Sequence, residues 1–396
     1  MTVVVVVTRP ERADLDGPSS ADGPDDDRAS GAGALVERIQ AALRHQDEEA
    51  AARLGGSDEA TRLLTVMVDN VETLDLDRIT LRYIDESDTS LSSARQGRYA
   101  PDAWVADVQL TWRLRGRDPA PSTVEVPFVI TAGQDALFLD VLVDPSYRVP
   151  MWVTGPVAVG ESPRVLVEAR SPAEARRLGR QAVVAVRTVN RSLPAWRGPL
   201  IVEAPGTAVA FSAASGLPRD QARGIAAVTT TTEPPGSPRP SVHVFLNPRV
   251  FRPLGPRGQQ IVLAHEATHV AVGAADTSLP LWLSEGYADY VALRHSPLPA
   301  TVLGAQIMAL VRRDGVPDRL PGAAELAGNN PDVGAWYESA WLAVDLMGDR
   351  YGAERVHRFY RTSDSESPRR AFSSVLGTTE AAFTREWQAR LDELAG

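Results

Sequence analysis

The segment GQQIVLAHEATHVAVG, residues 258–273, constrains the fold more than any other part of the chain. Two histidines, His265 and His269, stand in it with Glu266 between them and apolar residues on both sides. That pattern predicts a helix buried in the body of a domain. On a helix, side chains four residues apart lie one above the other on one face. The two imidazoles are therefore expected to converge on one metal ion.

Glu266 is the next residue round this helix, so it stands beside the ion without being well placed to ligate it. In that position its carboxylate can accept a proton from a water bound to the metal. The chain contains no cysteine, so any metal must be held by imidazole and oxygen ligands. The alternative interpretation is a hydrogen-bonded pair of core histidines, His265 and His269, with no metal.

A site with two histidines needs a third protein ligand, which leaves the fourth position open for water. The segment LPLWLSEGYADY, residues 279–290, predicts a second buried helix with the ionisable Glu285 inside it. A lone buried carboxylate is costly unless it is paired or bound to metal. Glu285 is therefore the candidate third ligand. The alternative is a carboxylate at the helix start that caps backbone amides near Ser284.

HEATH followed by WLSEGYADY resembles the gluzincin clan of zinc metallopeptidases, and in particular its peptidase-MA-like family, with the resemblance extending over residues 160–396. The resemblance implies a zincin-like domain and a peptide or protein substrate. It also implies that Zn²⁺ is bound by His265, His269 and Glu285. The Glu inside the HExxH motif is the catalytic base in that family, which here is Glu266.

The same resemblance suggests roles for two further residues. Asp289 lies one turn beyond Glu285, where relatives carry a carboxylate that accepts the second N–H of a ligating histidine; the alternative is a solvated surface aspartate. The segment DVGAWYESAWLAVDLMGDRYG resembles a downstream helix of the family whose tyrosine stabilises the oxyanion. Tyr337 is the candidate for that role, and the alternative is simple packing with Trp336 and Trp341.

The other four histidines are weaker candidates. His357 lies in the pattern of an ordinary half-exposed helix, as does His45. His295 follows Glu285 on the predicted helix but falls off the ligand face. His243, in SVHVFLNP, could lie on the sheet edge that pairs with an extended substrate, or could hold a plain strand position.

The chain lacks the Gly-x-Met-Glu-Asn-type segment with which aminopeptidases of the clan bind a free substrate amine. An endopeptidase is therefore the preferred prediction. Two alternatives to an endopeptidase remain. One is a zinc-binding hydrolase that acts on small amides, and the other is a cell-envelope binding protein with a degenerate peptidase fold.

The fold class predicted for the 396 residues is α+β, in two or three parts. Residues 1–33 are acidic and rich in Gly, Pro and Ser, which predicts disorder. Residues 34–155 read as helices followed by antiparallel strands, an order that resembles the nuclear transport factor 2-like cone. After a connection over 144–163, residues 160–396 read as a small sheet and then helices.

Hydrophobic periodicity and turn residues place the individual elements of these parts. Helices are expected over 35–54, 58–74 and 173–193, and strands over 77–86, 103–116, 123–131, 135–143, 164–169, 199–205, 224–233 and 241–248. From 258 onward the pattern is nearly all helical.

The net charge of −10 argues against a nucleic-acid partner, which would need a concentrated basic face. The apolar run from Val3 to Val7 is far too short to span a bilayer. It is interpreted either as a frayed terminus or as the end of an anchor or signal lost to a misplaced start, which would allow membrane association. An exported or envelope protein is thus as well supported as a cytoplasmic one.

Overall fold

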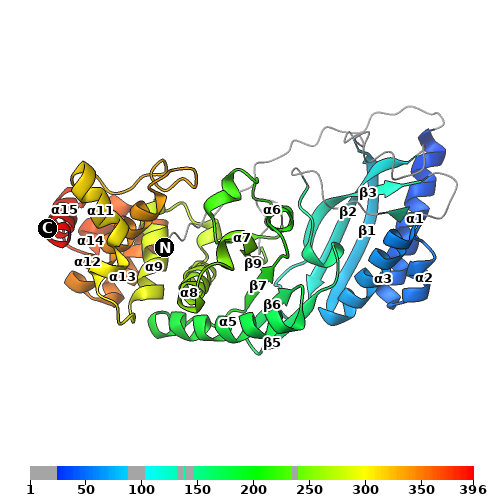
Figure 1. Cartoon of the computed structure of the whole chain (residues 1–396), viewed down its shortest axis with the longest axis horizontal. Coiled ribbons are helices and arrows are strands. Elements are labelled where there is room, and N and C mark those ends of the chain that lie inside the picture. The colour runs from blue at the N-terminus through cyan, green and yellow to red at the C-terminus, as the bar shows by residue number, and fades with distance from the viewer. Residues whose placement is uncertain (1–24, 88–102, 132–136, 139–146, 234–239) are drawn as a thin grey trace.

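The computed structural model describes residues 25–87, 103–131, 137–138, 147–233 and 240–396. Over these residues the chain is a mixed α+β protein with a four-stranded and a five-stranded sheet. Figure 1 shows an elongated molecule, with the first helices and the first sheet at one end, the second sheet in the middle and the C-terminal helices at the other end. None of the described helices has the length and apolar character that a membrane span needs.

The N-terminal module, residues 25–153, lays its helices on an antiparallel sheet whose strand order is β1-β2-β3-β4. Its elements are α1 (Asp25–His45), α2 (Glu48–Ala52), α3 (Asp58–Thr73), β1 (Leu76–Glu86), β2 (Trp104–Leu114), β3 (Ser122–Ile130), β4 (Leu137–Phe138) and the 3-10 helix η1 (Met151–Val153). Alternate residues of β2, such as Val108 and Leu110, are fully buried and share one core with apolar residues of α1 and α3. This alternation is what a strand with one covered face requires.

The prediction of disorder is wrong for residues 25–33, which form the first turns of α1. Tertiary contacts override the composition there. Ala32 is buried in the core. The guanidinium of Arg28 pairs with Glu86 at 3.4 Å and lies 5.3 Å from the ring centre of Trp104. Residues 1–24, which include the valine run and most of the acidic segment, lie outside the described residues.

The C-terminal module, residues 158–396, begins with the five-stranded sheet, in the order β5-β6-β7-β9-β8. The pairs β6–β7 and β7–β9 are parallel, and the outer strands β5 and β8 are antiparallel to their neighbours. The strands are β5 (Ala158–Ser162), β6 (Val165–Ala169), β7 (Leu200–Ala204), β8 (Ala227–Thr231) and β9 (Val242–Leu246). The helix α5 (Pro172–Ser192) connects β6 to β7 and runs along the lower side of the sheet in Figure 1.

The remaining elements of the C-terminal module are all helices. They are α6 (Ala208–Ser215) and the 3-10 helix η2 (Gln221–Gly224) between strands, then α7 (Pro248–Phe251), α8 (Pro256–Val272), the 3-10 helix η3 (Ala274–Asp276), α9 (Leu281–Leu293), α10 (Ala300–Leu303), α11 (Ala305–Asp314), α12 (Val333–Tyr351), α13 (Ala353–Ser365), α14 (Pro368–Ser374) and α15 (Glu380–Ala395). In Figure 1, α8 lies between the sheet and the helices α9, α12 and α13.

The two faces of the second sheet belong to two different cores. Leu166 and Ile201 point into the core of the N-terminal module, whereas their strand neighbours Val167 and Val202 belong to the core formed with α5, α8 and α9. The N-terminal module therefore shares buried apolar surface with the sheet that supports α8. Such a continuous core favours fixed packing over a flexible tether.

The predicted strands over 77–86, 103–116 and 123–131 are confirmed as β1, β2 and β3. Of the strand predicted over 135–143, only residues 137–138 are described. The predicted connection over 144–163 instead contains β5, which pairs with β6 across a two-residue turn at Pro163 and Arg164. The prolines and glycines around β5 hide its alternating pattern in the sequence. The strand is recognised only through its pairing with β6.

Candidate metal centre

Helix α8 carries the HEATH segment, and it is enclosed on several sides. Pro256 occupies its first turn, where the missing N–H costs nothing, and Gly273 ends it in the left-handed conformation with φ 69°. Residues 262–269 are all buried, because α5, α9 and strands β8 and β9 pack around the helix. The apolar flanks of the motif thus correspond to a helix inside the domain.

The structure brings His265, His269 and Glu285 together. The Nε2 atoms of the two histidines lie 3.0 Å apart. Oε2 of Glu285 lies 3.2 Å from Nε2 of His265 and 3.5 Å from Nε2 of His269. Glu285 reaches them from the second turn of α9, which packs against α8. Its carboxylate therefore faces the imidazoles and does not cap the helix start.

These distances can be compared with the requirements of a metal ion. Ligand bonds of about 2.0–2.1 Å in tetrahedral geometry place neighbouring ligand atoms roughly 3.3–3.4 Å apart. The three observed separations, 3.0, 3.2 and 3.5 Å, bracket that value. Within the described residues this is the one group of three or more such side chains with the spacing of a metal site. The donor set of two imidazoles and a carboxylate fits zinc.

Asp289 holds the ring of His265. Its Oδ1 lies 2.7 Å from Nδ1 of His265, and the aspartate is 8% exposed, so it is not a solvated surface residue. A carboxylate can only accept, so Nδ1 carries the proton and donates it to Asp289. The lone pair of the neutral ring then lies on Nε2, the atom that faces His269 and Glu285. The aspartate thereby orients the nitrogen suited to a metal.

The charges around the group favour a cation. Burial lowers the pKa of His265, but the charge of Asp289 and hydrogen bonds to Asp289 and Glu285 outweigh it and raise this pKa well above its usual range. Burial raises the pKa of Glu285, but the charge of His269 and hydrogen bonds from both imidazoles bring it to about 2. Carboxylates that draw an extra proton between buried imidazoles attract a metal cation for the same reason.

Glu266 stands next to the ligands with one oxygen engaged. Its Oε2 accepts a hydrogen bond from the hydroxyl of Thr229 at 2.6 Å. Among the residues that the structure describes, no partner reaches its buried Oε1. Burial raises the pKa of Glu266 although the neighbouring histidines and Thr229 lower it. A buried carboxylate with a raised pKa and a free oxygen is suited to accept and return a proton.

Tyr337 lies buried on α12, the helix that packs closely against α9. A Cβ on Gly286 would meet the carbonyl oxygen of Ala340, and one on Gly348 would meet the hydroxyl of Tyr290. The two helices therefore run in the same direction, and Tyr337, one turn before Ala340, lies toward the end of α9 that carries Glu285. The oxyanion role and the packing alternative for Tyr337 both stay predictions.

Two residues beside Glu285 or Glu266 were not singled out by the sequence patterns. Tyr360 on α13 is buried, and burial together with the charge of Glu285 raises the pKa of its phenol. Its ring lies 4.6 Å from that of Tyr287, whose hydroxyl contacts Nδ1 of His357 at 3.0 Å. Thr229, described above, is the second. Both contacts join elements far apart in the chain, which no local spacing signals.

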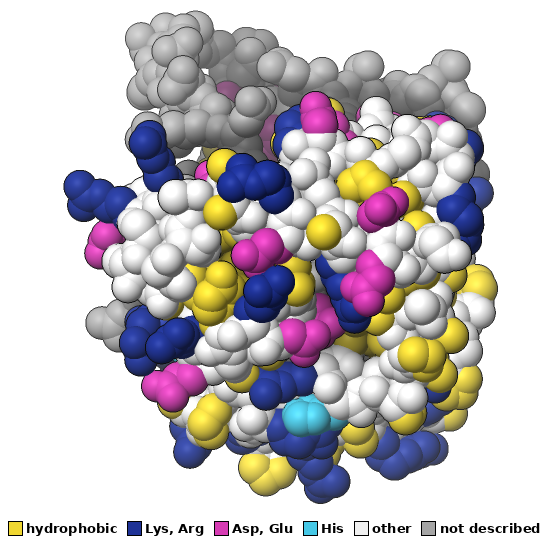
Figure 2. Space-filling model, turned by 90° about the vertical axis from the view of Figure 1, so that its left-hand side faces the viewer, with side chains coloured by type: hydrophobic (Ala, Val, Ile, Leu, Met, Phe, Trp, Pro, Cys, Tyr) yellow, Lys and Arg dark blue, Asp and Glu magenta, His cyan; other side chains and the backbone are white. Residues whose placement is uncertain are grey.

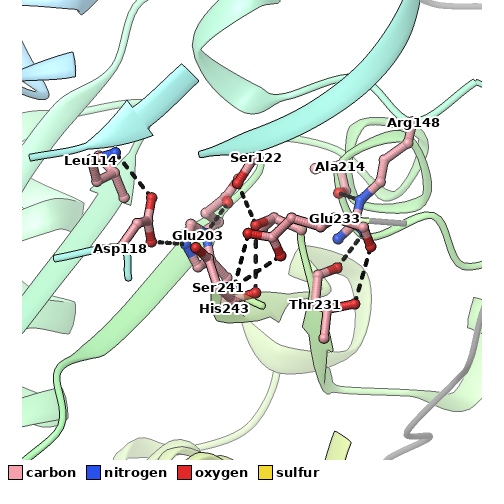
Figure 3. Close-up of polar contacts among 11 residues, drawn as sticks. Leu114, Asp118, Ser122, Arg148, Glu203, Ala214, Thr231, Glu233, Ser241 and His243 are labelled. Carbon is pink, nitrogen blue, oxygen red and sulfur yellow. Dashed lines mark hydrogen bonds and ion pairs between the residues drawn. The ribbon is translucent and has the colours of Figure 1, made fainter. Parts of the chain in front are cut away.

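His243 does not lie on a sheet edge, because β9 is flanked by β7 and β8. The substrate-pairing hypothesis for this residue is therefore wrong. Its ring is buried, with Nδ1 2.8 Å from Glu203 and Nε2 3.1 Å from Asp118 of the N-terminal module (Figure 3).

His45 ends α1 and is exposed. His295 is also exposed, just beyond the end of α9.

The candidate metal centre is covered by the surrounding protein. His265 and Glu285 are 0% exposed and His269 is 1% exposed. Figure 2 views the molecule from the end formed by the C-terminal helices, where acidic, basic and apolar side chains are interspersed.

The chain was compared with known proteins in three ways. No family model, no curated protein and no solved structure matches it. The geometry of the site therefore has to carry the functional inference.

Proposed function

We propose that this chain is a zinc-dependent endopeptidase in which His265, His269 and Glu285 hold the metal. The observation that carries the proposal is the convergence of Nε2, Nε2 and Oε2 within 3.5 Å of one another in a fully buried site. Glu285 also has a second buried oxygen, Oε1, without a hydrogen-bond partner among the described residues. A bound cation would supply a partner for that oxygen as well as for the paired Oε2.

Each residue of the site has its own role in the proposed hydrolysis of a peptide bond. Zinc held by the three ligands would polarise the scissile carbonyl and lower the pKa of water toward 7. Glu266 takes a proton from the attacking water at Oε1 and returns it to the leaving amine nitrogen. Asp289 keeps the proton of His265 on Nδ1 and fixes the ring. Tyr337 is the proposed donor to the oxyanion.

The proposal extends to the fold families. Support for a zincin-like C-terminal module comes from the sheet, α8 and α9, which place the HEATH helix beside the antiparallel edge strand β8. Support for a nuclear transport factor 2-like N-terminal module comes from helices packed on a four-stranded antiparallel sheet.

The complete burial of the ligands favours a second candidate function. A polypeptide substrate can reach the centre only after a part of the protein moves, whereas a small amide needs a much narrower path. A zinc hydrolase that acts on small amides is therefore the alternative. It uses the same residues and differs in substrate size.

The test compares wild type with Glu266→Gln, which keeps an acceptor for Thr229 and removes the base. We expect about one zinc per chain in both proteins and a fall of roughly 10²–10⁴-fold in hydrolysis of unfolded casein in the variant. Zinc in both proteins with no casein hydrolysis by wild type would favour the small-amide hydrolase.

Elemental analysis of His269→Ala tests the metal itself. We expect wild type purified without chelator to carry zinc and the variant to lose it. A wild-type protein without bound zinc, and with none taken up from zinc-containing buffer, would favour a non-enzymatic envelope protein in which the HEATH segment is only structural.

A further inference from the structure

The contact between Thr229 and Glu266 links the edge of the sheet to the catalytic helix. The hydroxyl of Thr229, on β8, donates to Oε2 of Glu266 at 2.6 Å, and both side chains are 0% exposed. That distance is in the range of a charge-assisted O–H···O⁻ hydrogen bond, which is stronger than one between neutral groups. Thr229 therefore makes a specific contact with the carboxylate rather than a packing contact alone.

The position of Thr229 is set by the strand. It lies opposite Val244 of β9, and side chains along a strand alternate between the faces of the sheet. Thr229 accordingly points toward α8, whereas Thr230, its neighbour opposite His243, points to the other face. A β-branched side chain has few χ1 rotamers, which limits the directions that the hydroxyl can take.

The end of β8 is anchored by residues outside the C-terminal module. Arg148 donates to the carbonyl oxygen of Thr231 (Figure 3). The hydroxyl of Ser122, on β3, lies 2.5 Å from that of Thr232. The guanidinium of Arg148 also donates to the carbonyl oxygen of Ala214. These contacts hold the chain two and three residues beyond Thr229, so the hydroxyl is presented from a fixed backbone.

The hydrogen bond distinguishes the two oxygens of Glu266. With Oε2 occupied by Thr229, Oε1 is the oxygen left to exchange a proton, and no described residue forms a hydrogen bond to it. We propose that Thr229 is the positioning residue of the general base: it holds the Glu266 carboxylate in one orientation and leaves Oε1 free. The inference rests on the proposed function for its catalytic meaning, but the contact itself can be tested without activity.

The activity test uses Thr229→Val, which keeps the β-branched shape and removes the donor. We expect kcat on a fluorogenic peptide to fall roughly 10–100-fold, the fold-change typical of losing a hydrogen bond to a charged group, with KM within about twofold and zinc content unchanged. Thr229→Ser should stay close to wild type. Thr230→Val, the same change on the opposite face of the strand, is the matched control and should leave kcat unchanged.

A thermal cycle tests the contact independently of catalysis. Thr229→Val should lower the melting temperature by a few degrees in the wild-type background. In a Glu266→Leu background the hydroxyl has lost its acceptor, so the same change should be neutral or stabilising.

The two tests separate the inference from the proposed function. Additive thermal effects, unchanged kcat in Thr229→Val of an active enzyme, or an equal loss in Thr229→Ser would each overturn the positioning role. A coupled thermal cycle in a protein without peptidase activity would keep the contact and reject the peptidase.

Discussion

Gly286 and Ala340 bring helices α9 and α12 into backbone contact: a Cβ at Gly286 would lie 2.4 Å from the carbonyl oxygen of Ala340. The same Cβ would also lie 2.9 Å from a methyl of Val344. Only a residue without a side chain allows this approach. Because Gly286 directly follows Glu285, the contact also sets how deeply the third candidate ligand reaches toward α8.

Gly286→Ala is therefore expected to push α9 away from α12 and to displace Glu285. Overpacking of this kind typically lowers the free energy of unfolding by about 1–3 kcal/mol. The variant should also bind zinc more weakly, measured by competition with a chromogenic chelator. Gly33→Ala is the matched control, since Gly33 lies in α1 with nothing within 4 Å of the added carbon. Wild-type zinc affinity in Gly286→Ala would contradict the proposed link.

Asp289→Ala tests whether the aspartate supports the metal through His265. Removing such a partner typically costs about 10–100-fold in metal affinity, because the ring loses its fixed orientation and tautomer. Asp332→Ala is the control, since among the described residues the Asp332 carboxylate pairs with Arg313 alone, near the surface, where ion pairs contribute little. Equal zinc affinities in the two variants would contradict the role of Asp289 in orienting His265 for the metal.

The part of the centre that the sequence could predict depends on local geometry. His265 and His269 share a helix face because they are four residues apart, and Asp289 follows Glu285 by the same spacing. These relations hold on any helix, whatever surrounds it. The carboxylate expected from the second helix does lie beside the imidazoles.

The remaining contacts depend on how distant elements pack, which periodicity does not encode. Thr229 meets Glu266 across 37 residues, and Asp118 meets His243 across 125. The prediction of disorder at the start of α1 is wrong for the same reason. Arg28 of this helix packs over Trp104, which belongs to a strand much later in the chain. In each case a tertiary contact decides the outcome, and composition or local spacing gives no signal of it.

Two buried phenols compete for the role of oxyanion donor. If Tyr337 donates, Tyr337→Phe should lower kcat by roughly 10²–10³-fold while KM and zinc content stay near wild type, because the hydrogen bond forms only in the transition state. Tyr360→Phe, a matched loss of one buried hydroxyl near Glu285, should then have little effect on kcat. The reverse result would transfer the role to Tyr360, and no effect in either variant would exclude both.

His243 predicts how stability depends on pH, because it joins Glu203 of the sheet to Asp118 of the N-terminal module. Burial lowers the pKa of His243, but the charge of Asp118 and hydrogen bonds to both carboxylates outweigh burial and raise it to about 10. A raised pKa stabilises the folded state fully below the unfolded value of about 6.5, and this contribution is lost as pH rises through about 10.

Denaturant unfolding of wild type and His243→Gln between pH 6 and 9.5, at constant zinc, measures this contribution. Gln cannot become charged and leaves the two buried carboxylates without their cation, so the variant should be less stable at pH 6 by about 3–5 kcal/mol. The difference should shrink steadily toward pH 9.5, where the wild-type imidazolium approaches its own pKa. His45→Gln, at the exposed end of α1, should show no such trend. A pH-independent gap would mean that His243 stabilises the module contact by shape and neutral hydrogen bonds, and not as a cation.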